Sequence, residues 1–322
     1  MLNVGYYLSE RKKQKLKWSD FVEYCKENHS IILHELDLTQ PIELEVKLDG
    51  ILQKITDELF NADELSKKKL SNFLNFINKN PEIVVIEDIE KLKVFRSRDD
   101  INKAIKPKVD EIENAFVPPS VVAANGLEAE ELISNHETIK YPVICKPVTS
   151  CGSVQTHDLY IVGNKEGLKN LNYFPYLITP YYNHYQTIYK TFINGDSYVS
   201  VPKYSIRGID PNELSDFKTA KLGKGMNIPE SMLPNRKIPL LKNLESEQLK
   251  LICEKVKSGL GVEIFGVDII CCEQDQRFSV IDVNYFPGFS GVPSFYQDLA
   301  ILVKKKIQNK SKSKTIEKDI NN

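Results

Sequence analysis

Two aspartates in the C-terminal third of the chain have the spacing of facing residues in a β-hairpin. Asp268 and Asp282 each lie in a run rich in Val, Ile and Phe, and the polar stretch between the runs predicts a turn centred on Asp275. Each aspartate is seven residues from that centre, so the two carboxylates should face each other across the strands. Like charges at a cross-strand distance of about 4.5–5.5 Å destabilise a sheet unless they are compensated. A bound cation is the compensation that we expect.

Asn284 shares a face of its strand with Asp282, because side chains alternate along a strand. Two carboxylates and an amide oxygen suit Mg²⁺ that is also held by phosphate oxygens. The alternative is a solvated surface hairpin, where Glu273 and Asp275 belong. Aspartate is a poor strand former, and the apolar neighbours of Asp268 and Asp282 favour the metal site.

Two lysines are placed to bind phosphate. Lys146 ends an apolar strand and precedes the small-residue loop 149–153, and Lys190 lies among aromatic residues within another strand. An ammonium group and loop N–H groups together can hold phosphates. Surface lysines with stems along apolar residues remain the alternative. The chain has no G-x-x-x-x-G-K-[ST] sequence, so a nucleotide would not bind through that loop.

Further basic residues follow strands near the N-terminus. Arg11, Lys12 and Lys13 come after the first strand and Lys54 after another, where the carboxyl ends of parallel strands commonly face a cleft. For Arg11 and Lys13 a solvated start of a helix is the favoured alternative. His157 lies just beyond the small-residue loop, and the other four histidines have no charged neighbours that suggest a site.

Hydrophobic patterns divide the chain into three parts. Residues 1–93 alternate strands and amphipathic helices, which predicts a small Rossmann-like α/β domain, although no G-x-G-x-x-G follows its strands. Residues 94–303 begin with a helix over Arg98–Ile105, and Pro107 and Pro118–Pro119 read as connectors. Short strands then outnumber helices, which predicts an α+β domain with antiparallel sheets. The expected strands are Val4–Leu8, Ile31–Leu36, Leu48–Leu52, Ile83–Ile86, Pro142–Cys145, Leu159–Val162, Tyr176–Thr179, Ile188–Phe192, Tyr198–Val201, Phe265–Cys271 and Phe278–Val283.

Two segments lack periodicity. Asp210–Asn243 reads as a long functional or mobile loop, and residues 304–322 as a basic, disordered tail. The tail lacks interleaved aromatic residues, so we expect no nucleic-acid partner.

Composition excludes several classes of protein. The 322 residues include 43 basic and 44 acidic side chains, and 41% are hydrophobic, which is ordinary for a globular protein and excludes collagen-like and wholly disordered chains. No apolar run reaches the roughly 18 to 20 residues that cross a bilayer, and Met1–Glu10 is too short and polar for a signal peptide, so we expect a cytoplasmic protein. Six cysteines without C-x-x-C spacing predict free thiols.

Five segments together resemble the inositol-tetrakisphosphate 1-kinase family, also called inositol 1,3,4-trisphosphate 5/6-kinases. They are Val4–Glu10 with the basic residues after it, Ile51–Asp57, Asn183–Lys190, Phe265–Asp268 and Ile281–Gly288, and the resemblance spans Val4–Val303. Asp-x-Asn-x-x-Pro occurs in many ATP-grasp enzymes, whereas Gly-Tyr-Tyr-Leu-Ser-Glu is far more specific. The resemblance implies an ATP-grasp fold in which ATP lies between two α+β lobes and the N-terminal domain helps to enclose an inositol phosphate.

The resemblance also implies roles for individual residues. Lys190 and His157 would be the catalytic residues, with His157 holding a substrate phosphate. The implied substrate-binding residues are Lys12, Lys54, His157, Lys190, Asn284 and Gly288; the implied ATP-binding residues are Arg96, Lys146, Thr179, Tyr181, Lys190 and Ser205; the implied magnesium ligands are Asp268, Asp282 and Asn284.

The chain departs from the family pattern at three places. Thr179 replaces the usual hinge glutamine and is followed by Pro180, which has no N–H to donate to adenine. Cys151 stands where relatives often have His or Gln. Gly223 and Asn227 replace two serines that approach ATP in the animal enzymes, so neither is assigned a role.

The expected reaction is transfer of the ATP γ-phosphoryl group to a ring hydroxyl of an inositol tris- or tetrakisphosphate, with two Mg²⁺ ions bridged by Asp282. We expect a monomer.

One alternative function is an ATP-grasp carboxylate–amine ligase, which would not explain the presence of Lys12 and Lys54. A catalytically inactive inositol phosphate sensor is the other, and the intact aspartates argue against it.

Overall fold

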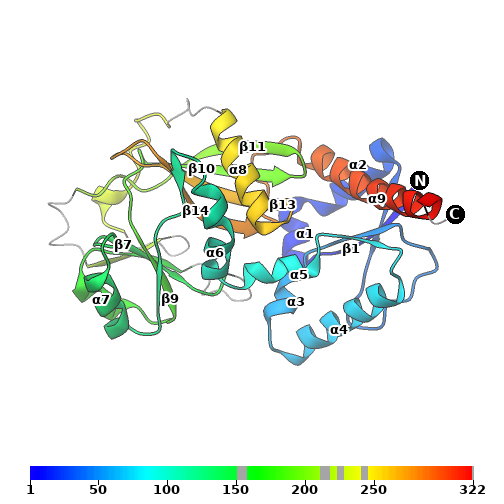
Figure 1. Ribbon diagram of the computed structural model, residues 1–322, viewed down its shortest axis with the longest axis horizontal. Helices are drawn as coiled ribbons and strands as arrows, with labels where there is room; N and C mark the ends of the chain where they lie inside the picture. Colours follow the sequence, from blue (N-terminus) through cyan, green and yellow to red (C-terminus); the bar gives the residue numbers. More distant parts are fainter. Residues whose placement is uncertain (151–157, 211–217, 223–227, 241–245, 321–322) are drawn as a thin grey trace.

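The chain forms an N-terminal α/β domain and a larger body built on two five-stranded sheets (Figure 1). The computed structural model describes residues 1–150, 158–210, 218–222, 228–240 and 246–320. Cavities lie where the N-terminal domain meets the larger body and between the two sheets of that body.

The N-terminal domain has a four-stranded parallel sheet in the order β2-β1-β3-β4. The predicted alternation of strands and helices is confirmed, and Phe21 of the second helix is fully buried. The elements are β1 (Leu2–Tyr7), α1 (Glu10–Leu16), α2 (Trp18–His29), β2 (Ile31–Glu35), β3 (Gly50–Gln53), α3 (Thr56–Phe60), α4 (Glu64–Lys79) and β4 (Val84–Ile86).

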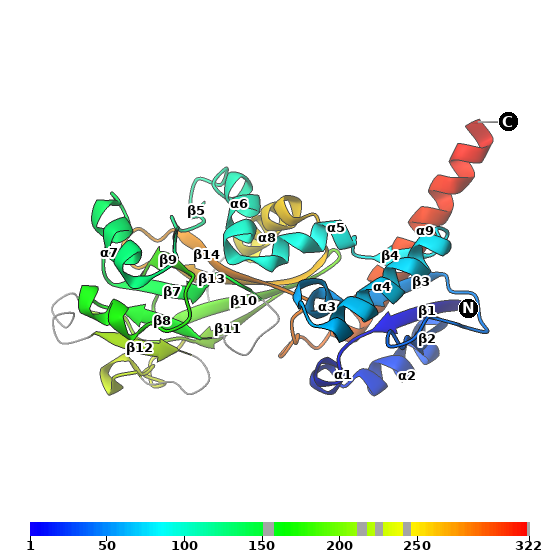
Figure 2. The same cartoon turned by 90° about the horizontal axis from the view of Figure 1, so that it is seen from below.

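The central sheet of the larger body carries the predicted carboxylate hairpin. Its order is β11-β10-β13-β14-β5, and α6 and α8 cover one face (Figure 2). The elements are α5 (Ile89–Leu92), η1 (Lys93–Arg96), α6 (Arg98–Val109), β5 (Ala115–Phe116), β10 (Thr187–Asn194), β11 (Ser197–Tyr204), α8 (Ser246–Leu260), β13 (Ile264–Cys271) and β14 (Phe278–Tyr285).

The second sheet is antiparallel, in the order β12-β8-β7-β9-β6, as the short strands predicted. Helix α7 packs beside it (Figure 1). Its elements are β6 (Val121–Ala123), α7 (Gly126–Asn135), β7 (Val143–Pro147), β8 (Leu159–Val162), η3 (Lys165–Asn170), β9 (Tyr176–Pro180), β12 (Thr219–Leu222) and η5 (Glu230–Met232).

Two expectations about irregular segments need correction. Pro107 is not a connector, since α6 continues through it to Val109. Strand β12 lies inside the predicted loop Asp210–Asn243, because pairing with β8 supplies order that four residues lack alone. The rest of that segment lies partly outside the described residues.

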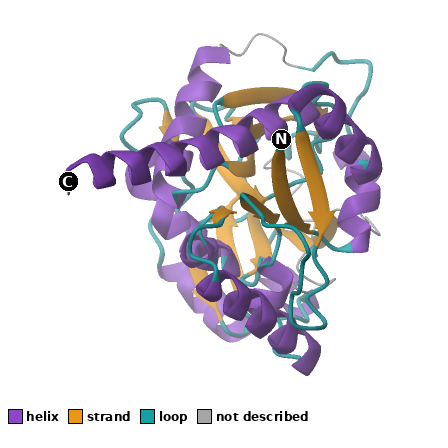
Figure 3. Ribbon diagram, turned by 90° about the vertical axis from the view of Figure 1, so that its right-hand side faces the viewer, coloured by secondary structure: helices purple, strands orange, loops and turns teal. Residues whose placement is uncertain are grey.

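The last helix, α9 (Phe295–Ile320), runs into the segment expected to be a disordered tail. It packs against α2, β3 and β4, and then extends past the N-terminal domain (Figures 2 and 3). Ile307 is buried, Lys306 pairs with Glu263 at 3.0 Å, and Lys310 Nζ donates to the carbonyl of Ile83 at 3.0 Å. These contacts order the helix through Lys310.

The cysteines that the structure describes match the predicted free thiols. Cys25, Cys145, Cys253, Cys271 and Cys272 are buried and unpaired with one another, while Cys151 lies outside the described residues. None of the described helices is long and apolar enough to span a bilayer.

Candidate functional site

Asp268 and Asp282 are directly opposed on β13 and β14, as predicted. The route to that register differs from the symmetrical turn that was assumed. Nearer the turn Ile270 pairs with Ser279 and Cys271 with Phe278, a register that would place Ile281 opposite Asp268. An irregularity between Asp268 and Ile269 shifts the register by one residue. Such bulges re-aim side chains near functional sites, and this one brings the two carboxylates together.

Cations of the protein surround the two carboxylates. Lys190 Nζ lies 2.5 Å from Asp268 Oδ2, and Arg98 Nε lies 3.5 Å from Asp282 Oδ1. Lys146 donates to the carbonyl oxygen of Ile281, the residue that the register shift leaves without a cross-strand partner. The expected charge compensation is therefore supplied partly by side chains.

The two carboxyl groups differ in acidity. Burial raises the pKa of Asp268, although Lys190 opposes this effect. Burial acts in the same sense on Asp282, but Arg98 and Lys146 outweigh it and hold the pKa of Asp282 below its ordinary value. Asp282 is thus the more strongly stabilised anion.

The hairpin face fits a divalent cation with incomplete protein coordination. Asn284 Nδ2 donates to Asp282 Oδ2 at 2.9 Å, so the amide and carboxylate share one side of β14. Among the described residues no three acidic, histidine or cysteine side chains cluster as a closed metal site. Two aspartates and the Asn284 oxygen would leave positions for oxygens of a ligand, which is how Mg²⁺ is usually held with phosphates.

A small cavity of about 150 Å³ lies between the two sheets of the larger body. It is largely apolar, with Ile144, Ile188 and Val280 among its walls, and Lys146 and Asp282 reach it as charged groups. Apolar walls with a few charged groups suit a flat base joined to phosphates. The predicted nucleotide residues in this lining are Lys146, Thr179, Tyr181 and Ser205.

Hydrogen bonds in this cavity limit what it can offer a base. The N–H of Tyr181 already donates to Pro142 O at 3.0 Å. Burial lowers the pKa of His184, and its Nδ1 lies 2.7 Å from Tyr182 O. A neutral ring with Nδ1–H must then accept at Nε2 from the Ser205 hydroxyl, 2.8 Å away. The hydroxyl of Ser205 therefore presents acceptor lone pairs to the cavity.

A larger cavity of about 820 Å³ lies between the N-terminal domain and the central sheet. Its lining contains the predicted substrate-binding residues Lys12, Lys54, Lys190, Asn284 and Gly288. Arg11, Lys15 and Lys203 also line it, whereas its acidic lining residues are Asp57 and Asp268. The cavity therefore suits a compact polyanion.

Lys12 is held deep in this cavity by main-chain oxygens. Its Nζ donates to Phe286 O at 2.6 Å and lies 5.8 Å from the centre of the Phe286 ring. Burial, reinforced by Lys54 and Lys15, lowers the pKa of Lys12 to about 7. Lys54 instead bonds to Thr56 Oγ1 at 3.0 Å and pairs with Asp57 at 3.3 Å.

The two cavities meet at Asp268 and Val283, which line both. A ligand in the small cavity and a ligand in the large cavity would therefore have Asp268 between them. The predicted residues that line a cavity thus form two groups, which meet at the carboxylate hairpin.

Several residues show the limits of the sequence prediction. Arg96 is exposed and lines neither cavity, while buried Arg98 lies against Asp282. The signal for Arg98 was its spacing with Ile101 and Ile105, which puts all three on the buried face of α6. Lys15 and Lys203 carried no comparable signal. His157 lies outside the described residues.

Comparison with known families covers nearly the whole chain. A profile described as "Inositol 1,3,4-trisphosphate 5/6-kinase ATP-grasp domain" matches residues 109–304, and one described as the pre-ATP-grasp domain of the same kinase matches residues 3–92.

Curated relatives are similar over most of their length. An inositol-tetrakisphosphate 1-kinase of Danio rerio is 31% identical over 92% of this chain and 76% of the relative. Inositol-tetrakisphosphate 1-kinase 1 of Arabidopsis thaliana is 26% identical over 91% of each chain.

Solved structures share the fold at low identity. The VanG D-Ala:D-Ser ligase of Enterococcus faecalis has a TM-score of 0.57 and 12% identity over 95% of this chain and 99% of the ligase. A RiPP-associated ATP-grasp ligase of Chryseobacterium gregarium also has a TM-score of 0.57, with 12% identity over 95% of this chain and 97% of that chain. These likenesses establish the ATP-grasp fold.

Proposed function

Because the chain belongs to the inositol 1,3,4-trisphosphate 5/6-kinase family, we propose that it transfers the γ-phosphoryl group of ATP to a ring hydroxyl of an inositol tris- or tetrakisphosphate. One observation carries this proposal. The small apolar cavity and the large basic cavity meet at Asp268, so a nucleotide and a polyanionic acceptor can approach each other there. A carboxylate–amine ligase has no need of a cavity with this excess of cations.

ATP is proposed to occupy the small cavity, with its base among the apolar walls and its phosphates toward Lys146 and Asp282. Arg98 takes the position at Asp282 that makes it a candidate for phosphate contact, in addition to the expected Arg96. Phosphoryl transfer depends mainly on alignment and on neutralisation of charge. Lys146 supplies such charge from the second sheet, and Lys190 supplies it from the strand beside the hairpin.

Asp268, Asp282 and Asn284 are proposed to hold Mg²⁺, with Asp282 shared if two ions bind. Bound Mg²⁺ would neutralise and orient the phosphates during transfer. Lys190 pairs with Asp268 at 2.5 Å and lines the large cavity, which is called the acceptor cavity below. It can therefore contact an acceptor phosphate beside the hairpin.

The inositol phosphate is proposed to occupy the large cavity, with phosphates toward Lys12, Lys54, Lys190 and the backbone at Gly288. Lysines act as point charges on flexible stems, so they tolerate several orientations of a ring that carries similar phosphates. Arg11, Lys15 and Lys203 widen the set of cations that such a substrate can meet. His157 is also proposed to contact a substrate phosphate.

The protein is further proposed to be a monomer and to lie in the cytoplasm.

The proposal is tested by incubating the protein with γ-labelled ATP, Mg²⁺ and a panel of inositol tris- and tetrakisphosphates, and identifying the products. We expect label on an inositol ring and ADP in equal amount. Label in free phosphate that depends on a carboxylic acid and an amine would instead identify a ligase. Binding of ATP and inositol phosphate without transfer or hydrolysis would identify a sensor.

A further inference from the structure

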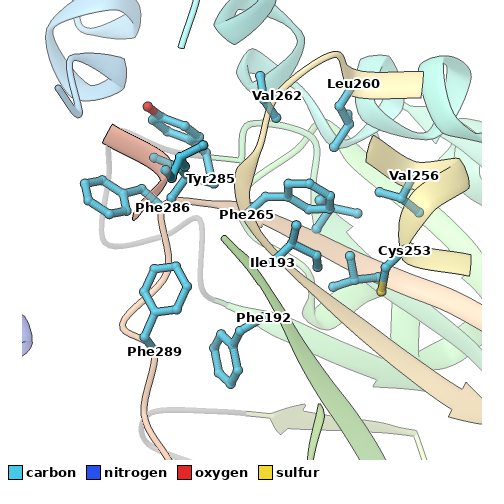
Figure 4. Close-up of a cluster of buried hydrophobic side chains, with 14 of the residues drawn as sticks. Phe192, Ile193, Cys253, Val256, Leu260, Val262, Phe265, Tyr285, Phe286 and Phe289 are labelled. Atoms are coloured by element: carbon cyan, nitrogen blue, oxygen red, sulfur yellow. The ribbon is translucent and has the colours of Figure 1, made fainter. Parts of the chain in front are cut away.

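Tyr285 connects the N-terminal domain to the β13–β14 hairpin that carries the proposed magnesium ligands, which is called the metal hairpin below. It follows Asn284 on β14, and its hydroxyl donates to the main-chain oxygen of Gln53 at 2.9 Å. Tyr285 is buried, and its ring lies 5.4 Å from that of Phe95. Figure 4 shows the ring at the edge of the apolar cluster, with its hydroxyl pointing away from Phe265 and Ile193. The bond therefore joins two bodies of the fold.

Gln53 is a rigid acceptor at the end of β3. Its side chain is fully buried, donating to Glu87 O at 3.1 Å and accepting from Ile55 N at 2.9 Å. Its neighbour Lys54 is held by the bond from its N–H to Tyr7 O at 2.9 Å. Because Gln53 and Lys54 share a peptide bond, a movement of Gln53 would also move Lys54.

The sequence neighbours of the bonded pair lie on the two sides of the acceptor cavity. Asn284 precedes Tyr285, Lys54 follows Gln53, and both Asn284 and Lys54 line that cavity. A second bond lies one residue further on, where Lys12 donates to Phe286 O at 2.6 Å. The end of β14 is thus tied to the N-terminal domain at two successive residues.

We infer that Tyr285 is a positioning residue, which sets the distance between the metal hairpin and the lysines that hold the acceptor. The inference rests on the proposed function. Tyr285 lines the large cavity, but its hydroxyl is taken up by the bond to Gln53 O, so the role inferred for that hydroxyl is to join the two bodies. Transfer requires the acceptor hydroxyl to be aligned with the γ-phosphate, and misplacement by about 1 Å can lower a rate by about 100-fold. Hydrolysis of ATP by water requires only the hairpin side of the site.

The test is Tyr285→Phe, which keeps the ring and removes only the hydroxyl. We expect transfer to inositol phosphate to fall about tenfold, with the KM for ATP and the rate of ATP hydrolysis without acceptor within about twofold of wild type. The quantity to measure is phosphate transferred per ATP consumed. Unchanged transfer, or transfer and hydrolysis that fall in parallel, would overturn the inference.

Tyr6→Phe is the matched control. Tyr6 lies on β1, and its hydroxyl donates to Glu35 at 3.0 Å within the N-terminal domain. It lines neither cavity. If it lowers the transferred fraction as much as Tyr285→Phe does, the effect is general loosening and the inference fails.

Hydrogen exchange gives a readout that is independent of the reaction. In Tyr285→Phe we expect faster amide exchange over residues 53–57 and 284–287, and wild-type exchange in β7 and α4. Unchanged exchange over both residues 53–57 and residues 284–287 would refute the role of the Tyr285 hydroxyl. This outcome can be reached even if the wild-type protein phosphorylates no inositol phosphate. Absence of transfer in wild type would count against the proposed function alone.

Discussion

Lys146 and Ile281 are joined by a hydrogen bond from the lysine ammonium to the main-chain oxygen of Ile281. Ile281 is the residue that the register shift leaves without a partner on β13. The same irregularity brings Asp282 opposite Asp268. Lys146, on the neighbouring sheet, therefore contacts the residue that the irregularity leaves unpaired. Four consequences of the site's geometry can be tested.

Asp282→Asn should strongly reduce transfer without unfolding the protein. The change keeps the volume of the side chain but removes the charge that faces Arg98 at 3.5 Å and would hold Mg²⁺. We expect transfer to fall by about 100-fold or more, the range found when a group that stabilises transition-state charge is removed. Thermal unfolding should be measured alongside the rate. Asp275→Asn, at the exposed turn of the same hairpin, is the control and should retain activity.

Lys203→Met should weaken binding of the inositol phosphate and leave binding of ATP unchanged. Lys203 lines the large cavity and not the small one, and it has no ion pair among the described residues. A hydrogen bond to a charged group contributes about 1.5–3 kcal/mol, so the KM for inositol phosphate should rise at least about tenfold. The KM for ATP should stay within twofold. Lys255→Met on α8 removes a lysine paired with Glu111, and equal effects from both variants would contradict the prediction.

Gly288→Ala should displace Lys15 from the acceptor cavity. A methyl group at Gly288 would lie 2.1 Å from Lys15 Cε and 2.7 Å from its Nζ, so the lysine must move. The end of a flexible side chain moves at small cost, and we expect the free energy of unfolding to change by less than about 1 kcal/mol. The KM for inositol phosphate should rise several-fold. Gly126→Ala, where the nearest atom is 3.8 Å away, is the control. An unchanged KM would show that Lys15 makes no contact with the acceptor.

Binding of the inositol phosphate should depend on pH through Lys12. Its pKa of about 7 means that the ammonium loses its proton as pH rises through 7 in the free protein. A bound phosphate favours the charged form, so affinity should strengthen as pH falls from 8 to 7, by at most about tenfold for one proton. Calorimetry in buffers of different ionisation enthalpy would measure that proton uptake.

Lys12→Arg tests the assignment of this pH effect. Arginine stays charged over the same range, so the variant should bind with little proton uptake and a flatter pH dependence. If the variant and the wild-type protein take up the same number of protons, the group that titrates is not Lys12.

Much of the site was predictable because it depends on local patterns. The facing pair Asp268 and Asp282 followed from a hairpin, and the place of Lys146 followed from its position at the end of an apolar strand. Alternation and periodicity act between near neighbours in the chain, so they are visible in one sequence. They also predicted the four strands of the N-terminal domain.

Only the tertiary structure decided which distant cations meet that hairpin. Arg98 reaches Asp282 from α6, Lys190 reaches Asp268 from β10, and Lys203 enters the acceptor cavity from β11. That Arg98 faces Asp282 depends on how α6 packs, and the bond from Tyr285 to Gln53 depends on how two domains are docked. Contacts between residues that are far apart in the chain arise from packing and charge across elements, which no local pattern encodes. The sequence by itself therefore determined the chemistry available, and the fold determined which groups share each cavity.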